Sequence, residues 1–272
     1  MSTSTSHLFP AVLRYWRTRR GFSQLELALE SDVSSRHISF LESGRARPSE
    51  EMVLRLFGVM SVPLRDQNQA LAAAGFEARF PSAPADVLAP EVDRALEQMM
   101  AQHAPFPLAV LSGDGVILRQ NCGARRLFQG FIASPEALPD PLDMFSLLFD
   151  PRLMRPFIVE WESLARSIVS RLHREHLHRR DARIGAVLDR IFTQPGVPRE
   201  WRLPDFSADV PPTLQLRLAR DDVRLGFLVA VTTFSTPQHV TVDELRIESC
   251  FPLDDRTRDA CVRDRGAVAF DR

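Results

Sequence analysis

The stretch from residue 23 to residue 44, SQLELALESDVSSRHISFLESG, most constrains what this chain can fold into. Ser23 and Glu26 have the spacing of a capping box, in which each side chain bonds to the other's backbone N–H and a helix begins. Five apolar residues then recur at helical spacing, so two short helices can bury one shared seam. These residues are Leu27, Ala28, Val33, Ile38 and Leu41.

The junction between the two helices also has a specific local chemistry. Asp32 lies where a tight bend often needs a positive φ, which Asp tolerates better than most residues other than glycine. Gly44 follows the second helix in the C′ position. The stretch therefore predicts a helix-turn-helix whose second helix, residues 34–43, is a candidate recognition helix.

Three further helices are predicted around this pair. Pro10 is a good first helical residue, and the apolar periodicity predicts helices over residues 10–20, 50–60 and 64–75. Residues 8–80 thus form an all-α domain of five helices. A short Pro/Ala-rich linker, residues 80–85, separates this domain from the rest of the chain.

Residues 86–272 predict an α+β domain. Two pairs of apolar runs flank turn residues, which indicates two hairpins. Amphipathic helices occur between them, so we expect an antiparallel sheet with helices on one face. The hairpins span residues 106–121 and 213–233, and the helices span residues 90–103, 127–131, 144–149, 153–177 and 184–192.

The distribution of charge points to the ligand of the N-terminal domain. The whole chain has a net charge of −1. The segment from Arg14 to Arg47, however, contains seven arginines and only four acidic residues. A basic end on a chain that is otherwise net acidic favours contact with a polyanion, and with this motif we expect double-stranded operator DNA.

Other classes of protein lack support in the sequence. The three cysteines are sparse and far apart, which argues against a disulfide framework and a Cys-rich zinc site. No apolar run approaches the ~20 residues that a membrane span needs, and the N-terminus lacks the features of a secretory signal. We therefore expect a cytoplasmic protein with no membrane partner. None of the common catalytic motifs occurs, so no enzyme activity is expected.

The candidate DNA contacts follow from the predicted helices. Gln24 begins the first helix of the pair, where backbone donors and its amide can hold a phosphate. Arg45 and Arg47 follow the recognition helix and should meet backbone phosphate. The early residues of the recognition helix are candidates for contacts with base edges. These are Ser34, Ser35, Arg36, His37 and Ser39.

The N-terminal region resembles the lambda-repressor/Cro type of domain, the xenobiotic-response-element (XRE) family, over residues 13–76. Two departures stand out: Asp32 replaces the usual turn glycine, and Leu25 and Leu29 are apolar on a helix face that is often polar. That face is a candidate for docking against the second domain. The matching residues are Ser23, Gln24, Leu27, Ala28, Val33, Ser34, Ile38, Ser39, Glu42, Gly44 and Pro48.

The C-terminal region resembles the PAS-like ligand-binding domain of MmyB-like regulators. The matching stretches are residues 107–128 with Asn121, residues 147–151, Trp161 with Arg171, residues 225–233 and residues 236–254. The resemblance implies a transcription regulator whose domain holds a fatty-acid-like molecule in an apolar cavity. As helix-turn-helix proteins commonly dimerise, a homodimer is expected.

A cavity of this kind needs an apolar lining with a few polar anchors. Asn121 and Arg171 are the candidate anchors, although Arg171 could equally be exposed or paired with Glu175. The alternative for the apolar residues is that they form ordinary core. The candidate lining residues are Phe106, Val110, Leu118, Phe128, Phe145, Phe149, Phe157, Trp161, Phe192 and Phe227.

Two alternatives remain open. The first is a redox or electrophile sensor that uses Cys122, which lies close to Arg125 and Arg126, or Cys250. The second is an adaptor whose helical domain contacts a partner protein in place of DNA. A metal site at His173, His176 and His178 is not expected. The sequence supplies no convincing fourth ligand, so a solvated polar face is favoured.

Overall fold

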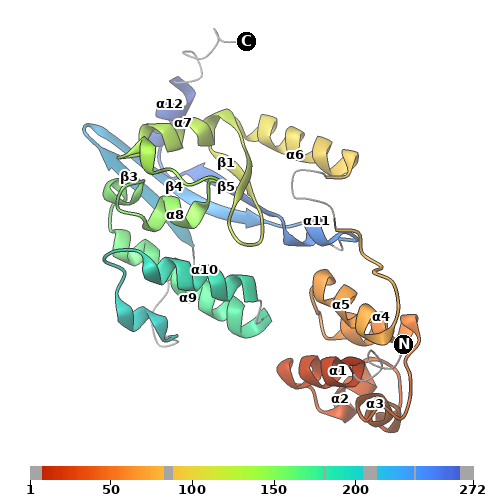
Figure 1. Ribbon diagram of the computed structural model, residues 1–272. Coiled ribbons are helices and arrows are strands. Elements are labelled where there is room, and N and C mark those ends of the chain that lie inside the picture. The colour runs from red at the N-terminus through yellow and green to blue at the C-terminus, as the bar shows by residue number, and fades with distance from the viewer. Residues whose placement is uncertain (1–7, 83–87, 180–181, 205–212, 236, 264–272) are drawn as a thin grey trace. The chain divides into compact units, whose positions relative to one another are not determined.

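The computed structural model describes residues 8–82, 88–179, 182–204, 213–235 and 237–263 (Figure 1). The chain divides into two compact units. The first comprises Met1–Pro84 with Ser235–Asp243, and the second comprises Ala85–Phe234 with Glu244–Arg272. The segment Ser235–Asp243 therefore joins the first unit, although the sequence placed it in the C-terminal domain.

The first unit contains the five predicted helices. They are α1 (Leu8–Arg19), α2 (Gln24–Glu30), α3 (Ser35–Glu42), α4 (Glu50–Val59) and α5 (Leu64–Ala74). Their apolar faces meet in one core that includes Leu13, Leu27, Ile38, Leu41 and Phe57. The prediction that Pro10 begins α1 is wrong, because the helix already includes Leu8 and Phe9.

The local features of the helix-turn-helix are as predicted. The Ser23 hydroxyl accepts a hydrogen bond from the Glu26 backbone N–H at 3.1 Å, and the Glu26 carboxylate accepts one from the Ser23 N–H at 2.7 Å. Asp32 has φ of 53° and Gly44 has φ of 73°. The turn and the C′ glycine therefore take the left-handed backbone that their residue types allow.

The second unit is built on a five-stranded antiparallel sheet in the order β2-β1-β5-β4-β3. The two predicted hairpins are confirmed as β1 (Leu108–Leu111) with β2 (Ile117–Gln120), and β3 (Leu214–Arg220) with β4 (Val223–Thr232). The strand β5 (Arg246–Pro252) was not predicted. It pairs with both β1 and β4 and so joins the two hairpins into one sheet.

Helices cover both faces of this sheet, so the prediction of helices on one face is wrong. On one side, α6 (Pro90–His103) packs through Leu96 against Val110 and Ile247. Strand β1 presents Ala109 and Leu111 to the opposite side, because successive strand residues point to opposite faces. That side is covered by α7 (Cys122–Gly130), α8 (Met144–Phe149), α9 (Trp161–Arg179) and α10 (Ala182–Thr193).

Two predicted helices have different bounds. Helix α7 begins at Cys122, five residues before the predicted start, because Asn121 caps it by accepting from the Ala124 N–H. The helix predicted over residues 153–177 begins only at Trp161. The residues before Trp161 are not α-helical, because a 3₁₀ turn forms at Arg155–Phe157 and Glu160 has a positive φ of 54°. The short helices α11 (Val240–Glu244) and α12 (Asp255–Arg263) were not predicted.

Candidate functional site

The recognition helix α3 presents an exposed N-terminal end. Ser35 and Arg36 are exposed, and His37 and Ser39 are half-buried. The Arg36 guanidinium lies over the Phe40 ring, 5.2 Å from its centre, which orients this side chain along the helix surface. Ser34 lies just before α3 as its N-cap, and its hydroxyl accepts a hydrogen bond from the His37 N–H at 3.2 Å.

A polar network around Glu42 connects α1, α2 and α3. Its carboxylate is buried and accepts from Arg17 Nε at 2.5 Å, Arg17 Nη2 at 3.0 Å and Gln24 Nε2 at 2.8 Å. Arg14 lies 3.7 Å away. Burial would raise the pKa of Glu42, but the hydrogen bonds from Arg17 and Gln24 and the two arginine charges hold that pKa below its usual value. The Gln24 amide nitrogen is thus bonded to Glu42, within the unit.

Two arginines follow the recognition helix. Arg45 and Arg47 are exposed, and the chain that carries them turns away from α3 through the left-handed Gly44. The Arg45 N–H donates to the Phe40 carbonyl at 2.9 Å, so the start of this loop is fixed to the helix. The backbone at Arg45 is therefore held against the last turn of α3, while both arginine side chains are exposed.

Leu25 and Leu29 lie outside the core of the first unit. Their exposed fractions are 59% and 71%. The two residues are four apart on α2, so they form one apolar strip on its outer face.

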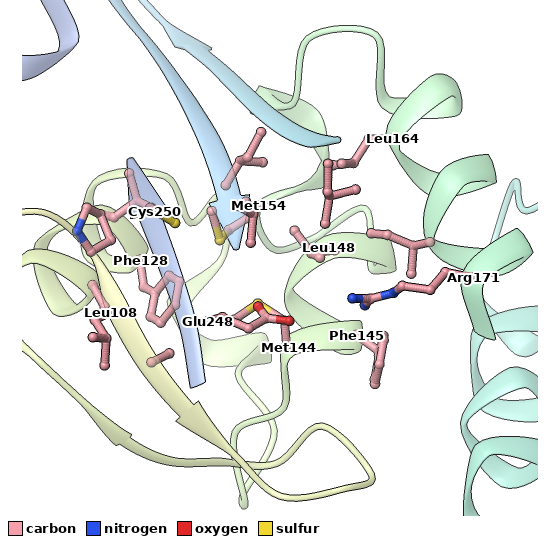
Figure 2. Close-up of a pocket in the computed structure, with 18 residues that line it drawn as sticks. Leu108, Phe128, Met144, Phe145, Leu148, Met154, Leu164, Arg171, Glu248 and Cys250 are labelled. Atoms are coloured by element: carbon pink, nitrogen blue, oxygen red, sulfur yellow. The ribbon is translucent and has the colours of Figure 1, made fainter. Parts of the chain in front are cut away.

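The second unit contains an apolar cavity between the sheet and helices α7, α8 and α9 (Figure 2). The volume of this cavity is about 50 Å³. That is smaller than the roughly 300–1,000 Å³ of typical small-molecule sites, so a ligand of that size enters only if the walls move apart. The walls are formed by Pro107, Leu108, Ala109, Ala124, Leu127, Phe128, Met144, Phe145, Leu148, Met154, Leu164, Ile168, Arg171, Leu214, Leu216, Val229, Glu248 and Cys250.

Two charged side chains, Arg171 and Glu248, line this otherwise apolar space. Figure 2 shows the Arg171 guanidinium and the Glu248 carboxylate pointing toward each other from α9 and β5. Burial raises the pKa of Glu248, while the charge of Arg171 lowers it, and the net direction is upward. The cavity therefore has one polar end.

Three of the predicted lining residues, Phe128, Phe145 and Arg171, line the cavity. Phe149 and Trp161 belong to the same hydrophobic core and pack edge to face, with ring centres 5.8 Å apart. They lie outside the lining, as do Phe157 and Phe192. Phe227 is fully buried and lines a neighbouring hollow next to Cys261.

The remaining predicted residues have other positions. Val110 and Leu118 pack on the opposite face of the sheet in the α6 cluster, and the Phe106 ring contacts His103. Asn121 does not line the cavity. Its Oδ1 accepts from the Ala124 and Leu108 N–H groups, and its Nδ2 donates to the Phe106 carbonyl at 2.9 Å. Asn121 thus fixes the connection from sheet to helix.

Comparison with known families agrees with both halves of this architecture. The family model described as the MmyB-like transcription regulator ligand binding domain matches residues 92–263. A helix-turn-helix model matches residues 13–67. The first match covers more than half of the chain.

The chain belongs to the MmyB-like transcription regulators. It is a DNA-binding regulator of the XRE type with a ligand-sensing C-terminal domain. A search of curated proteins found no match. Within the described ranges of this MmyB-like regulator, no helix combines the length and apolarity that crossing a membrane requires.

Sequence reasoning missed most of the lining of the cavity in this MmyB-like regulator. Glu248 and Cys250 were missed because β5 was not recognised as a strand. The signal in the sequence is weak. In residues 246–252, RIESCFP, Ile247 and Phe251 favour a strand, and in a strand Glu248 and Cys250 point to one face. Met144, Leu148 and Met154 carry no such signal, because only packing distinguishes lining from core.

The cysteines of this regulator differ in environment. Cys250 is buried in the cavity wall, and burial, followed by the charges of Glu248 and Cys261, raises its pKa to about 12. A thiol with so high a pKa carries little of the reactive thiolate. Cys122 is exposed at the start of α7, so it is the better candidate for the redox alternative.

The histidine cluster of this regulator has a structural explanation for two members. His173 is buried, and its Nε2 lies 2.8 Å from the Trp201 carbonyl. His176 lies against Gly185 of α10, and the side chain of His178 falls outside the described residues. Among the residues described, no group of three His, Cys, Asp or Glu side chains is placed to hold a metal ion.

Proposed function

We propose that this regulator binds operator DNA as a cytoplasmic homodimer and that a small apolar, fatty-acid-like molecule in the cavity changes its operator affinity. We also propose that it regulates without catalysing a reaction. The observation that carries the proposal is the apolar cavity between the sheet and helices α7, α8 and α9. Its lining is aliphatic and aromatic except at one end, which suits a chain-like molecule with a single polar group.

The connection between β4 and β5 supports an effect on DNA binding. Val229 of β4 and Glu248 and Cys250 of β5 line the cavity. The segment between these strands, Ser235–Asp243, belongs to the unit that contains the helix-turn-helix. A ligand that shifts β5 therefore acts on a strand whose preceding residues are part of the DNA-binding unit.

The contacts of this segment show how it is held in the first unit. Asp243 Oδ2 accepts a hydrogen bond from the Leu64 N–H, at 3.3 Å, at the N-terminus of α5. The Val240 N–H donates to the Pro81 carbonyl at 3.0 Å. Pro63, the N-cap of α5, supplies no side-chain cap, so Asp243 fills this role from a distant part of the chain.

Native mass spectrometry of the purified full chain, followed by identification of any released molecule, tests the first part of the proposal. We expect an acyl-chain compound at one copy per protomer. Operator fragments selected with the full chain then report DNA affinity with and without that compound, and we expect a change of about 5- to 150-fold, the usual range of such coupling. Bound compound with unchanged operator affinity would overturn the regulatory part alone.

A cavity-blocking variant gives the matched comparison. Ile168→Phe adds bulk to the wall formed by α9, and Arg174→Phe adds it to an exposed position of the same helix. We expect Ile168→Phe to lose the bound compound and its effect on operator affinity, and Arg174→Phe to keep both. Equal retention by the two variants would contradict binding in this cavity.

A further inference from the structure

We infer that Arg171 and Glu248 together select a neutral polar head group, such as the amide or hydroxyl end of an acyl chain, over a free carboxylate. This inference rests on the proposed ligand-binding function and specifies the class of ligand. It depends on where the two side chains lie, on what they contact, and on the balance of charge at that end of the cavity.

The two charges are placed on opposite walls by regular structure. On α9, Leu164, Ile168 and Arg171 are spaced four and three residues apart, so they share one face and all line the cavity. On β5, Glu248 pairs in register with Ala109 of β1, another lining residue. Figure 2 shows both charged groups directed into the space between these walls.

Neither group has a hydrogen-bond partner among the described residues. Within the described part of the chain, the Arg171 guanidinium and the Glu248 carboxylate form no ion pair with each other and no hydrogen bond with another residue; they interact only as charges across the gap. Arg171 is also exposed to solvent, so this polar end lies at the mouth of the cavity. A ligand group between them can accept hydrogen bonds from the guanidinium and donate one to the carboxylate.

The balance of charge decides which head group fits. When both groups are ionised, the charges of Arg171 and Glu248 sum to zero, so a neutral amide or hydroxyl leaves the site uncharged and supplies both the acceptor and the donor. A carboxylate would gain from Arg171 but would place a second negative charge beside Glu248 without a donor for it. Uncompensated charge is costly in a partly desolvated site, and a site of this kind rejects a ligand by leaving such a group unmatched.

Decanoate and decanamide test the inference, because they share one chain length and differ only in the head group. Titration calorimetry on the full chain, stripped of co-purified lipid, measures both dissociation constants at pH 7.5. We expect decanamide to bind at least tenfold more tightly than decanoate. Glu248→Gln should reduce this preference at least tenfold by improving decanoate binding, whereas Glu97→Gln, at an exposed position of α6, should leave it unchanged.

Arg171→Gln gives an independent readout that does not depend on the behaviour of Glu248→Gln. It should weaken the binding of both decanoate and decanamide, and Arg174→Gln on the same helix should weaken the binding of neither. Decanoate binding as tight as decanamide binding, with a ratio unaffected by Glu248→Gln, would overturn the inference and leave the proposed function standing. Binding of neither probe to the wild-type chain would overturn both.

Discussion

At the scale of single residues, Glu42 connects three helices of the DNA-binding unit. Its exposed fraction is 4%, and it accepts hydrogen bonds from side chains on α1 and α2 while belonging to α3. The recognition helix is therefore oriented by a charge that is buried but fully paired. Removal of one partner from such a network leaves the others uncompensated, which is why it is expensive.

Glu42→Gln should lower the free energy of unfolding of the first unit by about 1–3 kcal/mol, because Arg17 loses its charged partner. The pKa of Glu42 is lowered in the folded state, so its contribution is present above the unfolded-state pKa and is lost as pH falls through the folded-state pKa. The difference between wild type and variant should thus shrink on acidification. Hydrogen exchange of the α1–α3 amides measures this. Glu51→Gln, in an exposed pair with Arg55, should show little change, and a pH-independent difference would contradict the argument.

Arg36 and Arg47 should affect DNA binding in different ways. Arg36→Ala, in the exposed first turn of α3, should reduce discrimination between the selected operator and a mutated one by about 1–3 kcal/mol. Arg47→Ala should weaken binding to both operator sequences equally. It should also make the slope of log affinity against log salt concentration less steep by about one unit. Fluorescence anisotropy at several salt concentrations separates the two effects. Equal weakening of both sequences by Arg36→Ala would identify Arg36 as a phosphate contact.

At the scale of elements, β5 and the segment before it connect the wall of the cavity to the DNA-binding unit. The strand completes the sheet between β1 and β4 and carries two residues of the cavity wall. The residues just before it include Asp243, which caps α5. One continuous stretch of chain thus contains both part of the cavity wall and a support of the DNA-binding unit.

Asp243→Ala should remove the cap of α5 and lower the stability of that helix by about 1 kcal/mol, the usual cost of a lost N-cap. If the segment transmits ligand binding, the variant should also show a smaller ligand-induced change in operator affinity at an unchanged ligand dissociation constant. Anisotropy and calorimetry on the full chain measure both quantities. Asp255→Ala, at the exposed start of α12, is the control. An undiminished response in Asp243→Ala would show that coupling takes another route.

At the scale of the whole molecule, a homodimer would place two α3 helices in successive major grooves about 34 Å apart. An insertion of 5 base pairs between the half-sites rotates one half-site by about half a turn. It should therefore lower operator affinity at least tenfold, and an insertion of 10 base pairs should restore part of the loss. Anisotropy with the three operators measures this. Equal affinity for all three would indicate binding to a single half-site.

The sequence alone determined the features that depend on neighbouring residues. The capping box at Ser23, the left-handed turn at Asp32 and the bounds of α6 all follow from side chains and backbone within a few positions of one another. The two hairpins follow from turn residues between apolar runs. Such interactions can be predicted from the sequence because the interacting residues are close together along the chain.

Only the tertiary structure decided which residues face the cavity. Asn121 was an expected anchor, yet the backbone of β1 and α7 uses its polar atoms. Glu248 was not expected, because β5 becomes a strand only by pairing with two strands that come much earlier in the chain. The face that an apolar residue turns to a cavity depends on packing between distant elements, and residue type does not encode that choice. Arg171 and Glu248 line the same cavity for this reason, through the fold that places α9 opposite β5.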